Sequence, residues 1–171
     1  WVLPLATGHT KDATASLLSA EGFEVLAQEN FEKAADDPSH TCAYTIAKKE
    51  IELDGQTRPM LLVIVRGTQA GEWYSNFDFA PSHSGDTAFA ENFLFAAEDV
   101  FLGLKGYIDA ETNPLVLVSG HSRGAACANI LGKMLTDRYG AQRVYAYTFA
   151  TPRTVRGEYP AYANIFNVIN P

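Results

Sequence analysis

The chain has 171 residues, a net charge of −7 and a hydrophobic content of 47%, as expected for one globular domain with one sizeable core. This acidic balance lacks the basic face that a duplex-binding protein needs, so no nucleic-acid partner is expected. No apolar run approaches the length of a membrane-spanning helix, so no transmembrane segment is expected either.

The first half of the chain predicts one helix followed by three strands. These elements cover residues 11–20, 23–26, 41–53 and 59–65. Thr10 is suited to cap the helix at its start, and Gly22 to end it. Asp54-Gly55 is a strong turn signal, so the last two strands should form an antiparallel hairpin. We expect residues 41–53 to be an outer strand and the apolar residues 61–65 to be buried on both faces.

The second half predicts an irregular loop and then alternating helices and strands. The loop covers residues 66–86, and the elements that follow cover residues 86–108, 115–119, 123–139, 144–149 and 164–169. Strands that alternate with helices imply an α/β fold, in which a mostly parallel sheet is covered by helices on both faces. The antiparallel N-terminal hairpin completes the predicted sheet.

A candidate catalytic motif lies between the strand at 115–119 and the next helix. Gly120-His121-Ser122-Arg123-Gly124 has the form G-x-S-x-G. Between a strand and a helix this is the pattern of a nucleophile elbow, in which glycines permit a sharp turn and the serine hydroxyl stands exposed. The alternative is a plain Gly-Ser turn that joins a strand to a helix.

A serine hydroxyl becomes a strong nucleophile when an oriented base takes its proton, and an oxyanion hole must hold the developing charge. We predict Ser122 as the nucleophile and the backbone N–H of Arg123 as one oxyanion donor. A second donor should come from the loop after an earlier buried strand, and residues 61–65 lead into Arg66-Gly67-Thr68. The Arg123 side chain is left for another use, such as a surface ion pair.

The two cysteines, Cys42 and Cys127, form no CxxC and no metal-binding pattern, so no metal is predicted. Cys127, on the helix after the elbow, is most simply a small buried hydrophobe. The number and spacing of the cysteines do not indicate in which cellular compartment the protein functions.

Four segments each carry a different motif, and the four motifs follow one another in a fixed order along the chain. They are residues 65–78 (V-R-G-T, then Trp, Asn and Asp), 119–126 (S-G-H-S-R-G-A-A), 148–153 (T-F-A-T-P-R) and 166–170 (F-N-V-I-N). In this order they resemble the R-G-T/S … D-W … N-x-D, G-H-S-L-G-G-A-L, T-F-G-x-P-R and N-V-V-N motifs of the class 3 lipases. Those enzymes are α/β-hydrolases typified by fungal triacylglycerol lipases and their bacterial relatives. Arg123 and Ala125 depart from the family's leucine and glycine.

The resemblance implies an α/β-hydrolase domain that cleaves acylglycerols or similar lipid esters through an acyl-serine intermediate, without metal or organic cofactor. It implies that Thr68 is an oxyanion donor and that Trp73 and Tyr74 lie in the lid or contact the acyl chain. The alternative for the two aromatic residues is a place in the core. The resemblance implies a structural role for His83, favours secretion and allows contact with a lipid interface, whereas the oligomeric state stays open.

The catalytic base and acid are not evident in the chain. After Ser122 the only carboxylates are Asp137 and Glu158, and no histidine follows, whereas this fold places acid and then histidine after the serine. We therefore expect residues 1–171 to form a single α/β-hydrolase domain that lacks a C-terminal segment, or one part of a split protein. The alternatives are a non-catalytic pseudo-hydrolase that binds an acyl ligand or a partner, and a thioesterase or peptidase on the same core.

Overall fold

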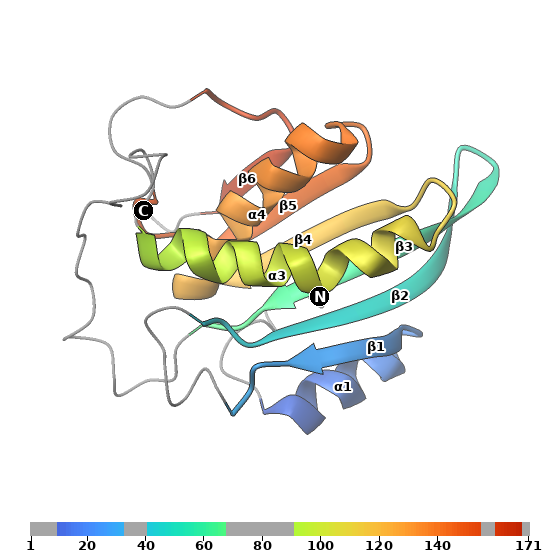
Figure 1. Ribbon diagram of the computed structural model, residues 1–171. Helices are drawn as coiled ribbons and strands as arrows, with labels where there is room; N and C mark the ends of the chain where they lie inside the picture. Colours follow the sequence, from blue (N-terminus) through green and yellow to red (C-terminus); the bar gives the residue numbers. More distant parts are fainter. Residues whose placement is uncertain (1–9, 33–40, 68–90, 155–159, 169–171) are drawn as a thin grey trace.

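The computed structural model describes residues 10–32, 41–67, 91–154 and 160–168 (Figure 1). Its elements in chain order are α1 (Lys11–Ala20), β1 (Glu24–Glu29), β2 (Tyr44–Leu53), β3 (Gln56–Val65), α3 (Glu91–Asp109), β4 (Leu115–His121), α4 (Arg123–Tyr139), β5 (Val144–Phe149) and β6 (Ile165–Val168). The strands form one six-stranded sheet in the order β1-β2-β3-β4-β5-β6. The β1–β2 and β2–β3 pairs are antiparallel, and the three pairs from β3 to β6 are parallel.

The turns that bound the first elements confirm the local predictions. The Thr10 side chain accepts a hydrogen bond from the Ala13 amide and so caps α1. The β2–β3 hairpin turns at Asp54 (φ 51°) and Gly55 (φ 74°), and positive φ at both positions is the geometry that matches the twist of a hairpin.

The prediction that residues 41–53 form an outer strand is wrong, because β2 lies between β1 and β3. The register explains why its sequence suggested an edge. Strand β1 pairs only with the stretch from Tyr44 to Lys48, whereas the stretch from Lys49 to Leu53 extends past it. The stretch that extends past β1 still pairs with β3 but carries the more exposed charged residues, whereas Tyr44 to Ala47, beside β1, are buried.

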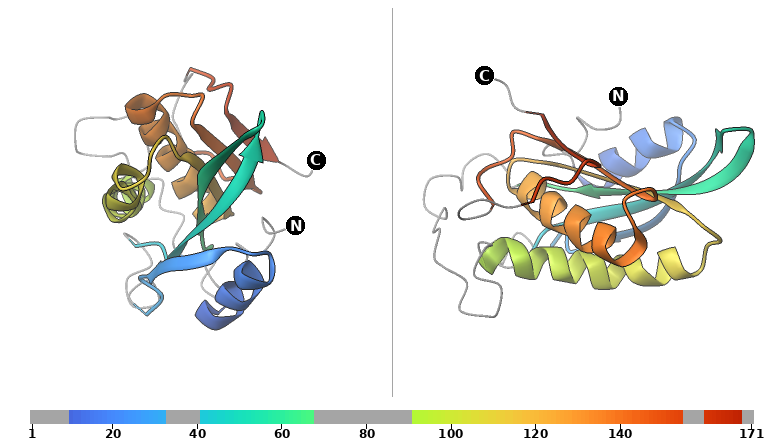
Figure 2. Two further views of the ribbon diagram at one scale, coloured as in Figure 1. Left: turned by 90° about the vertical axis from the view of Figure 1, so that its right-hand side faces the viewer. Right: turned by 90° about the horizontal axis from the view of Figure 1, so that it is seen from above.

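Helices cover both faces of the sheet, as predicted (Figure 2). Side chains along β3 alternate between the two faces. Leu61, Val63 and Val65 pack into the larger core beneath α3 and α4. Leu62 and Ile64 face the other way and form a smaller cluster with Leu18 of α1. Strand β3 is thus buried on both faces, which accounts for its unbroken apolar run.

Helix α3 presents one apolar stripe to the sheet. Its buried members are Phe93, Ala96, Ala97, Val100, Leu104 and Ile108, and Phe101 packs against the same core from a partly exposed position. The predicted start of this helix, residues 86–90, lies outside the described residues, as does most of the predicted loop at residues 66–86.

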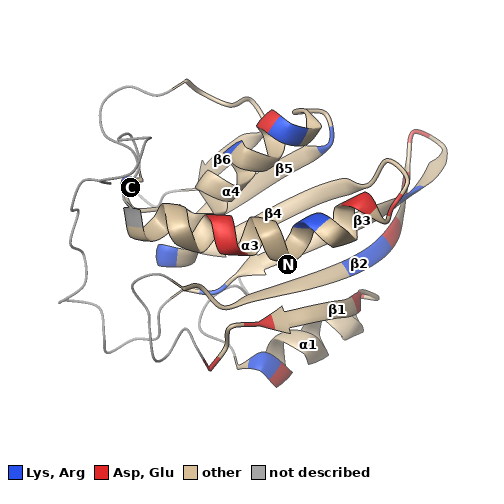
Figure 3. Ribbon diagram, viewed as in Figure 1, with Lys and Arg blue, Asp and Glu red and all other residues tan. Residues whose placement is uncertain are grey.

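Charged residues are absent from β4, β5 and β6, which are wholly tan in Figure 3. Among the described residues, Asp, Glu, Lys and Arg lie on the helices, on β1 to β3 and in connecting segments. Strand β4, which leads into the candidate site, therefore carries no side-chain charge.

Two glycines let α4 approach the ends of β3 and β4 closely. A Cβ atom at Gly124 would lie 2.8 Å from the Arg66 carbonyl carbon and closer still to the Val65 oxygen. A Cβ atom at Gly120 would lie 2.8 Å from the Ala125 nitrogen and would overlap the Gly124 carbonyl. Because all these neighbours are backbone atoms, neither position has room for a side chain.

Gly124→Ala should lower the free energy of unfolding by about 2–3 kcal/mol, because helix and strand must separate to admit the methyl group. Gly106→Ala is the matched control: it is an exposed position inside α3, and apart from its chain neighbours and the nearby backbone of its own helix no described atom lies within 4 Å of the added Cβ. That control should raise the stability by about 0.5–1 kcal/mol. Urea unfolding followed by circular dichroism measures both, and equal effects of the two substitutions would contradict the close approach.

Candidate active site

Ser122 forms the turn between β4 and α4. Its backbone has φ 54° and ψ −122°, a region that residues with a side chain rarely adopt. The Ser122 amide donates to the Phe149 carbonyl at 2.9 Å, and the Ser122 carbonyl accepts from the Ala126 amide at 3.1 Å. Strain of this kind persists only where the surroundings hold the residue, and it concentrates at functional sites. The local geometry is that of the predicted nucleophile elbow.

The Ser122 hydroxyl is not used to stabilise the fold. The expectation that this hydroxyl stands exposed is wrong for the described residues, because Ser122 is only 3% exposed; its Oγ atom has no hydrogen-bond partner among them. The side chain does not cap α4 either, although serine favours that role. A buried hydroxyl without a partner costs free energy. Ser119 shares this feature, so the strained turn is what distinguishes Ser122.

The elbow lies at the carboxyl edge of the parallel strands. The sheet register places Gly120 beside Val65 and His121 beside Phe149. The ends of β3 and β5 therefore flank the turn, and open α/β sheets bind their ligands at this edge. Gly67 lies against the elbow, since a Cβ atom there would be 2.9 Å from the His121 carbonyl oxygen.

A second strained residue adjoins the first. Ala150 follows β5 with φ 50°, and its amide donates to the Val168 carbonyl at 3.0 Å. In the T-F-G-x-P-R motif that this segment resembles, glycine occupies the same position, and glycine adopts positive φ without steric cost. Ser122 and Ala150 thus place two unusual backbone turns at neighbouring strand ends.

Arg123 has both its backbone and its side chain at the site. Its N–H group is the first of α4, and the first N–H groups of a helix have no intrahelical acceptor. The Arg123 side chain makes no ion pair with any residue that the structure describes; instead, its Nη1 atom donates to the Thr41 carbonyl at 2.9 Å. This hydrogen bond holds the segment before β2 against the elbow helix.

A polar cluster beyond the elbow was missed from the sequence. Asn167 Oδ1 accepts hydrogen bonds from Thr148 Oγ1 at 2.6 Å, Asn129 Nδ2 at 2.7 Å and Thr151 Oγ1 at 3.2 Å. The cluster ties the end of β5 and helix α4 to β6. Threonine and asparagine at the ends of apolar strands were the available signal, although their convergence depends on the sheet order.

Among the described residues after Ser122, Asp137 is the only carboxylate, and it is poorly placed to serve as the triad acid. It lies fifteen residues after Ser122, or roughly 22 Å along α4 at the rise of an α-helix. Lys133 donates a hydrogen bond to its carboxylate at 2.7 Å and, with Tyr162, lowers the pKa of Asp137. Asp137 is therefore an ionised residue of the distal end of the helix.

Thr68, Trp73, Tyr74 and His83 lie outside the described residues, as does Glu158. Within the described ranges, three or more His, Cys, Asp or Glu side chains do not gather anywhere into a potential metal site. No helix in those ranges has the length and apolar character needed to cross a membrane.

Solved structures with a similar fold are fungal lipases. The chain matches the native propeptide complex of Rhizomucor miehei lipase with a TM-score of 0.61 and 19% identity, over 98% of this chain and 54% of that one. It matches a mutant of MDLA from Penicillium cyclopium with a TM-score of 0.63 and 19% identity, over 93% and 59%. A triacylglycerol lipase with a serine protease triad as its catalytic centre matches with a TM-score of 0.56 and 19% identity, over 88% and 58%.

The chain thus spans somewhat more than half the length of these lipases, and at such identities the likeness concerns the fold. A search of curated protein sequences finds no match. The family model for class 3 lipases matches residues 62–170, which is well over half of the chain and includes the elbow. The chain belongs to the class 3 lipase family.

Proposed function

We propose that this chain carries the nucleophile of a serine carboxylic-ester hydrolase that acts on acylglycerols or similar lipid esters. The observation that carries the proposal is the Ser122 turn, where a strained backbone presents a hydroxyl that has no hydrogen-bond partner among the described residues. Family membership supports the lipid-ester substrate class. Thioester and peptide cleavage are the competing activities of the same core.

In the proposed reaction a base takes the Ser122 proton as Oγ attacks the ester carbonyl carbon. The carbonyl π electrons move onto its oxygen, and the Arg123 N–H group at the start of α4 stabilises that charge together with Thr68. When the tetrahedral intermediate collapses, the leaving alkoxide oxygen takes a proton from the protonated base and departs as the alcohol, and acyl-Ser122 remains. Water then repeats the sequence and releases the carboxylic acid.

We propose that the acid and base come from a part of the protein outside residues 1–171. Two observations support this: no histidine follows Ser122, and the chain matches only 54–59% of the length of the lipases described above. Trp73 and Tyr74 are proposed to contact the acyl chain or the lipid interface, on the strength of the resemblance. We also propose that the protein is secreted, again on the strength of the resemblance to the class 3 lipases.

Ser122→Ala should abolish labelling of the intact protein by a fluorophosphonate, because the proposed mechanism gives only the Ser122 hydroxyl a base and oxyanion donors. Ser119→Ala is the matched control. Ser119 lies on β4 three residues earlier, is fully buried, and its Oγ atom also lacks a hydrogen-bond partner among the described residues. Labelling should persist in the control, as mass spectrometry of the modified peptide would show. Labelling that survives Ser122→Ala would assign the nucleophile elsewhere.

Thr68→Val should lower kcat for p-nitrophenyl butyrate about a hundredfold with little change in KM, because the loss of one oxyanion donor weakens transition-state binding. Thr57→Val provides the control, since Thr57 is exposed on β3 and its hydroxyl bonds to Glu52, far from the elbow along the strand. Equal kinetics of the two variants would remove Thr68 from the oxyanion hole.

Residues 1–171 alone should hydrolyse p-nitrophenyl butyrate at a small fraction of the rate of the intact protein, because loss of the base removes most triad catalysis. The two forms are compared at equal folded concentration, with circular dichroism as the check on folding. Equal rates would place the base within the chain, and His83 would then be the first residue to substitute. Two inactive forms would favour a pseudo-hydrolase that binds an acyl ligand.

A further inference from the structure

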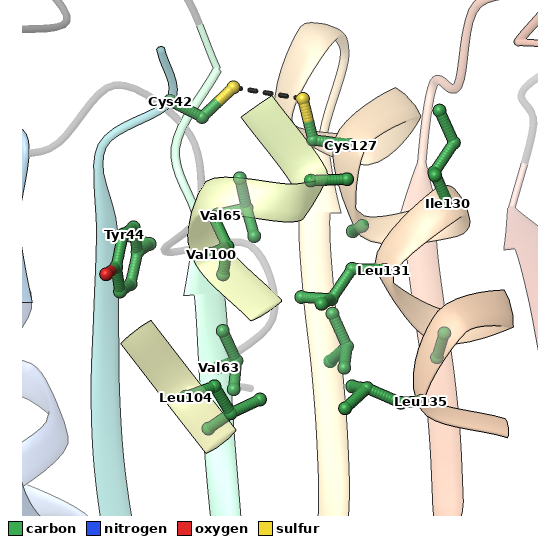
Figure 4. Packing of buried hydrophobic residues seen from close by; sticks show 14 of the residues in the cluster. Cys42, Tyr44, Val63, Val65, Val100, Leu104, Cys127, Ile130, Leu131 and Leu135 are labelled. Atoms are coloured by element: carbon green, nitrogen blue, oxygen red, sulfur yellow. Dashed lines mark hydrogen bonds between the residues drawn. The ribbon is translucent and has the colours of Figure 1, made fainter. Parts of the chain in front are cut away.

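Two buried cysteines meet between β2 and the elbow helix. Cys42 precedes β2 and Cys127 lies in α4, 85 residues later, and their Sγ atoms are 3.0 Å apart (Figure 4). The side chains are 1% and 0% exposed. The separation is shorter than a van der Waals contact between two sulfur atoms, and about 1 Å longer than a disulfide bond. The structure contains both residues as free thiols.

The backbone on either side of Cys42 is held in place. The Thr41 carbonyl accepts from the Arg123 guanidinium at 2.9 Å, and the Ala43 carbonyl accepts from the Arg66 amide at 2.8 Å. Arg123 and Cys127 are four residues apart on α4, so they share one helix face. That helix face therefore contacts the segment before β2 at two points, through Arg123 and through Cys127. These contacts hold the two sulfur atoms opposite each other.

The surroundings favour a thiolate at Cys42. A hydrogen bond from the Cys127 thiol, with help from the positive charges of Arg123 and Arg66, lowers the pKa of Cys42 against the effect of burial. Sharing its proton with Cys42, together with burial, raises the pKa of Cys127. The thiolate is the form of cysteine that attacks a disulfide. Cys42 is therefore the thiol that attacks first, while Cys127 keeps its own proton.

We propose that Cys42 and Cys127 are a modification site, at which a low-molecular-weight disulfide such as oxidised glutathione converts the two thiols into one intramolecular disulfide. The Cys42 thiolate attacks one sulfur of the oxidant, which forms a mixed disulfide and expels a glutathione thiolate. Cys127 gives up its proton to that thiolate or to water, and its sulfur then attacks the Cys42 sulfur and expels the second glutathione thiolate. Two electrons pass to the oxidant, and the protein thiols release two protons.

Because both sulfurs are buried, the exchange takes place in a local opening that exposes Cys42, or during folding once the two cysteines have come together, and the folded packing selects this pair. The bond would close a loop of about 85 residues and join the start of β2 to the elbow helix. A crosslink that closes a loop of this length strongly lowers the conformational entropy of the unfolded chain and so stabilises the folded protein.

The first test is direct identification of the bond. The intact protein is refolded from denaturant in a mixture of reduced and oxidised glutathione, alkylated with iodoacetamide and digested with trypsin. We expect the peptide at residues 34–48 to be linked to the peptide at residues 124–133, with the link lost after dithiothreitol. Two separately alkylated peptides, two glutathione adducts, or a partner other than Cys127 for Cys42 would overturn the proposal.

The second test separates a covalent bond from ordinary packing. The oxidised protein should melt about 5–10 °C above the same protein in dithiothreitol, because the crosslink acts on the unfolded chain. Cys42→Ala and Cys127→Ala lose the same packing whether or not reductant is present, so each should melt at one temperature under both conditions. A dithiothreitol shift that persists in these variants, or that is absent from the wild-type protein, would overturn the proposal.

Discussion

The close approach of α4 to the ends of β3 and β4 is the constraint on which the candidate site depends. At Gly120 and Gly124 only a hydrogen atom fits between backbone segments, so the chain must pass from strand to helix within a single residue. That residue is Ser122, and the tight passage holds it at a positive φ. Such strain costs on the order of 1–3 kcal/mol. It is offset by the helix that follows, in which Cys127, Leu131 and Leu135 are wholly buried.

The parts of the fold that were predicted correctly have signals within a few residues. The Thr10 cap, the turn at Asp54 and Gly55, and the Gly140 end of α4 act through neighbouring backbone groups, so their effect can be read locally. The elbow belongs to the same class, because two glycines around one serine already require a sharp turn. The error at β2 was of another kind: a strand near β1 was predicted, but no local pattern specifies that it pairs with β2 and so makes β2 an interior strand.

Site details that the sequence did not provide depend on contacts across the fold. Arg123 finds its acceptor at Thr41, 82 residues earlier, and Cys127 meets Cys42 across 85. Asn167 becomes the common acceptor of two threonines and an asparagine only when β6 lies beside β5. In each case the residue types were visible, whereas their partners depended on the order of strands and on the angle at which α4 crosses them.

The strands lie in the sheet in the same order as in the chain. During synthesis on the ribosome each new strand can therefore join the free edge of the strand before it, and none has to enter between two that are already paired. The β1–β2–β3 unit can form early, because its antiparallel connection between β2 and β3 is a tight hairpin. The parallel additions wait for α3 and α4, since a crossover needs its helix. The elbow turn can consequently pack against the end of β3, where Gly124 makes its close approach, as soon as β4 and α4 have been added.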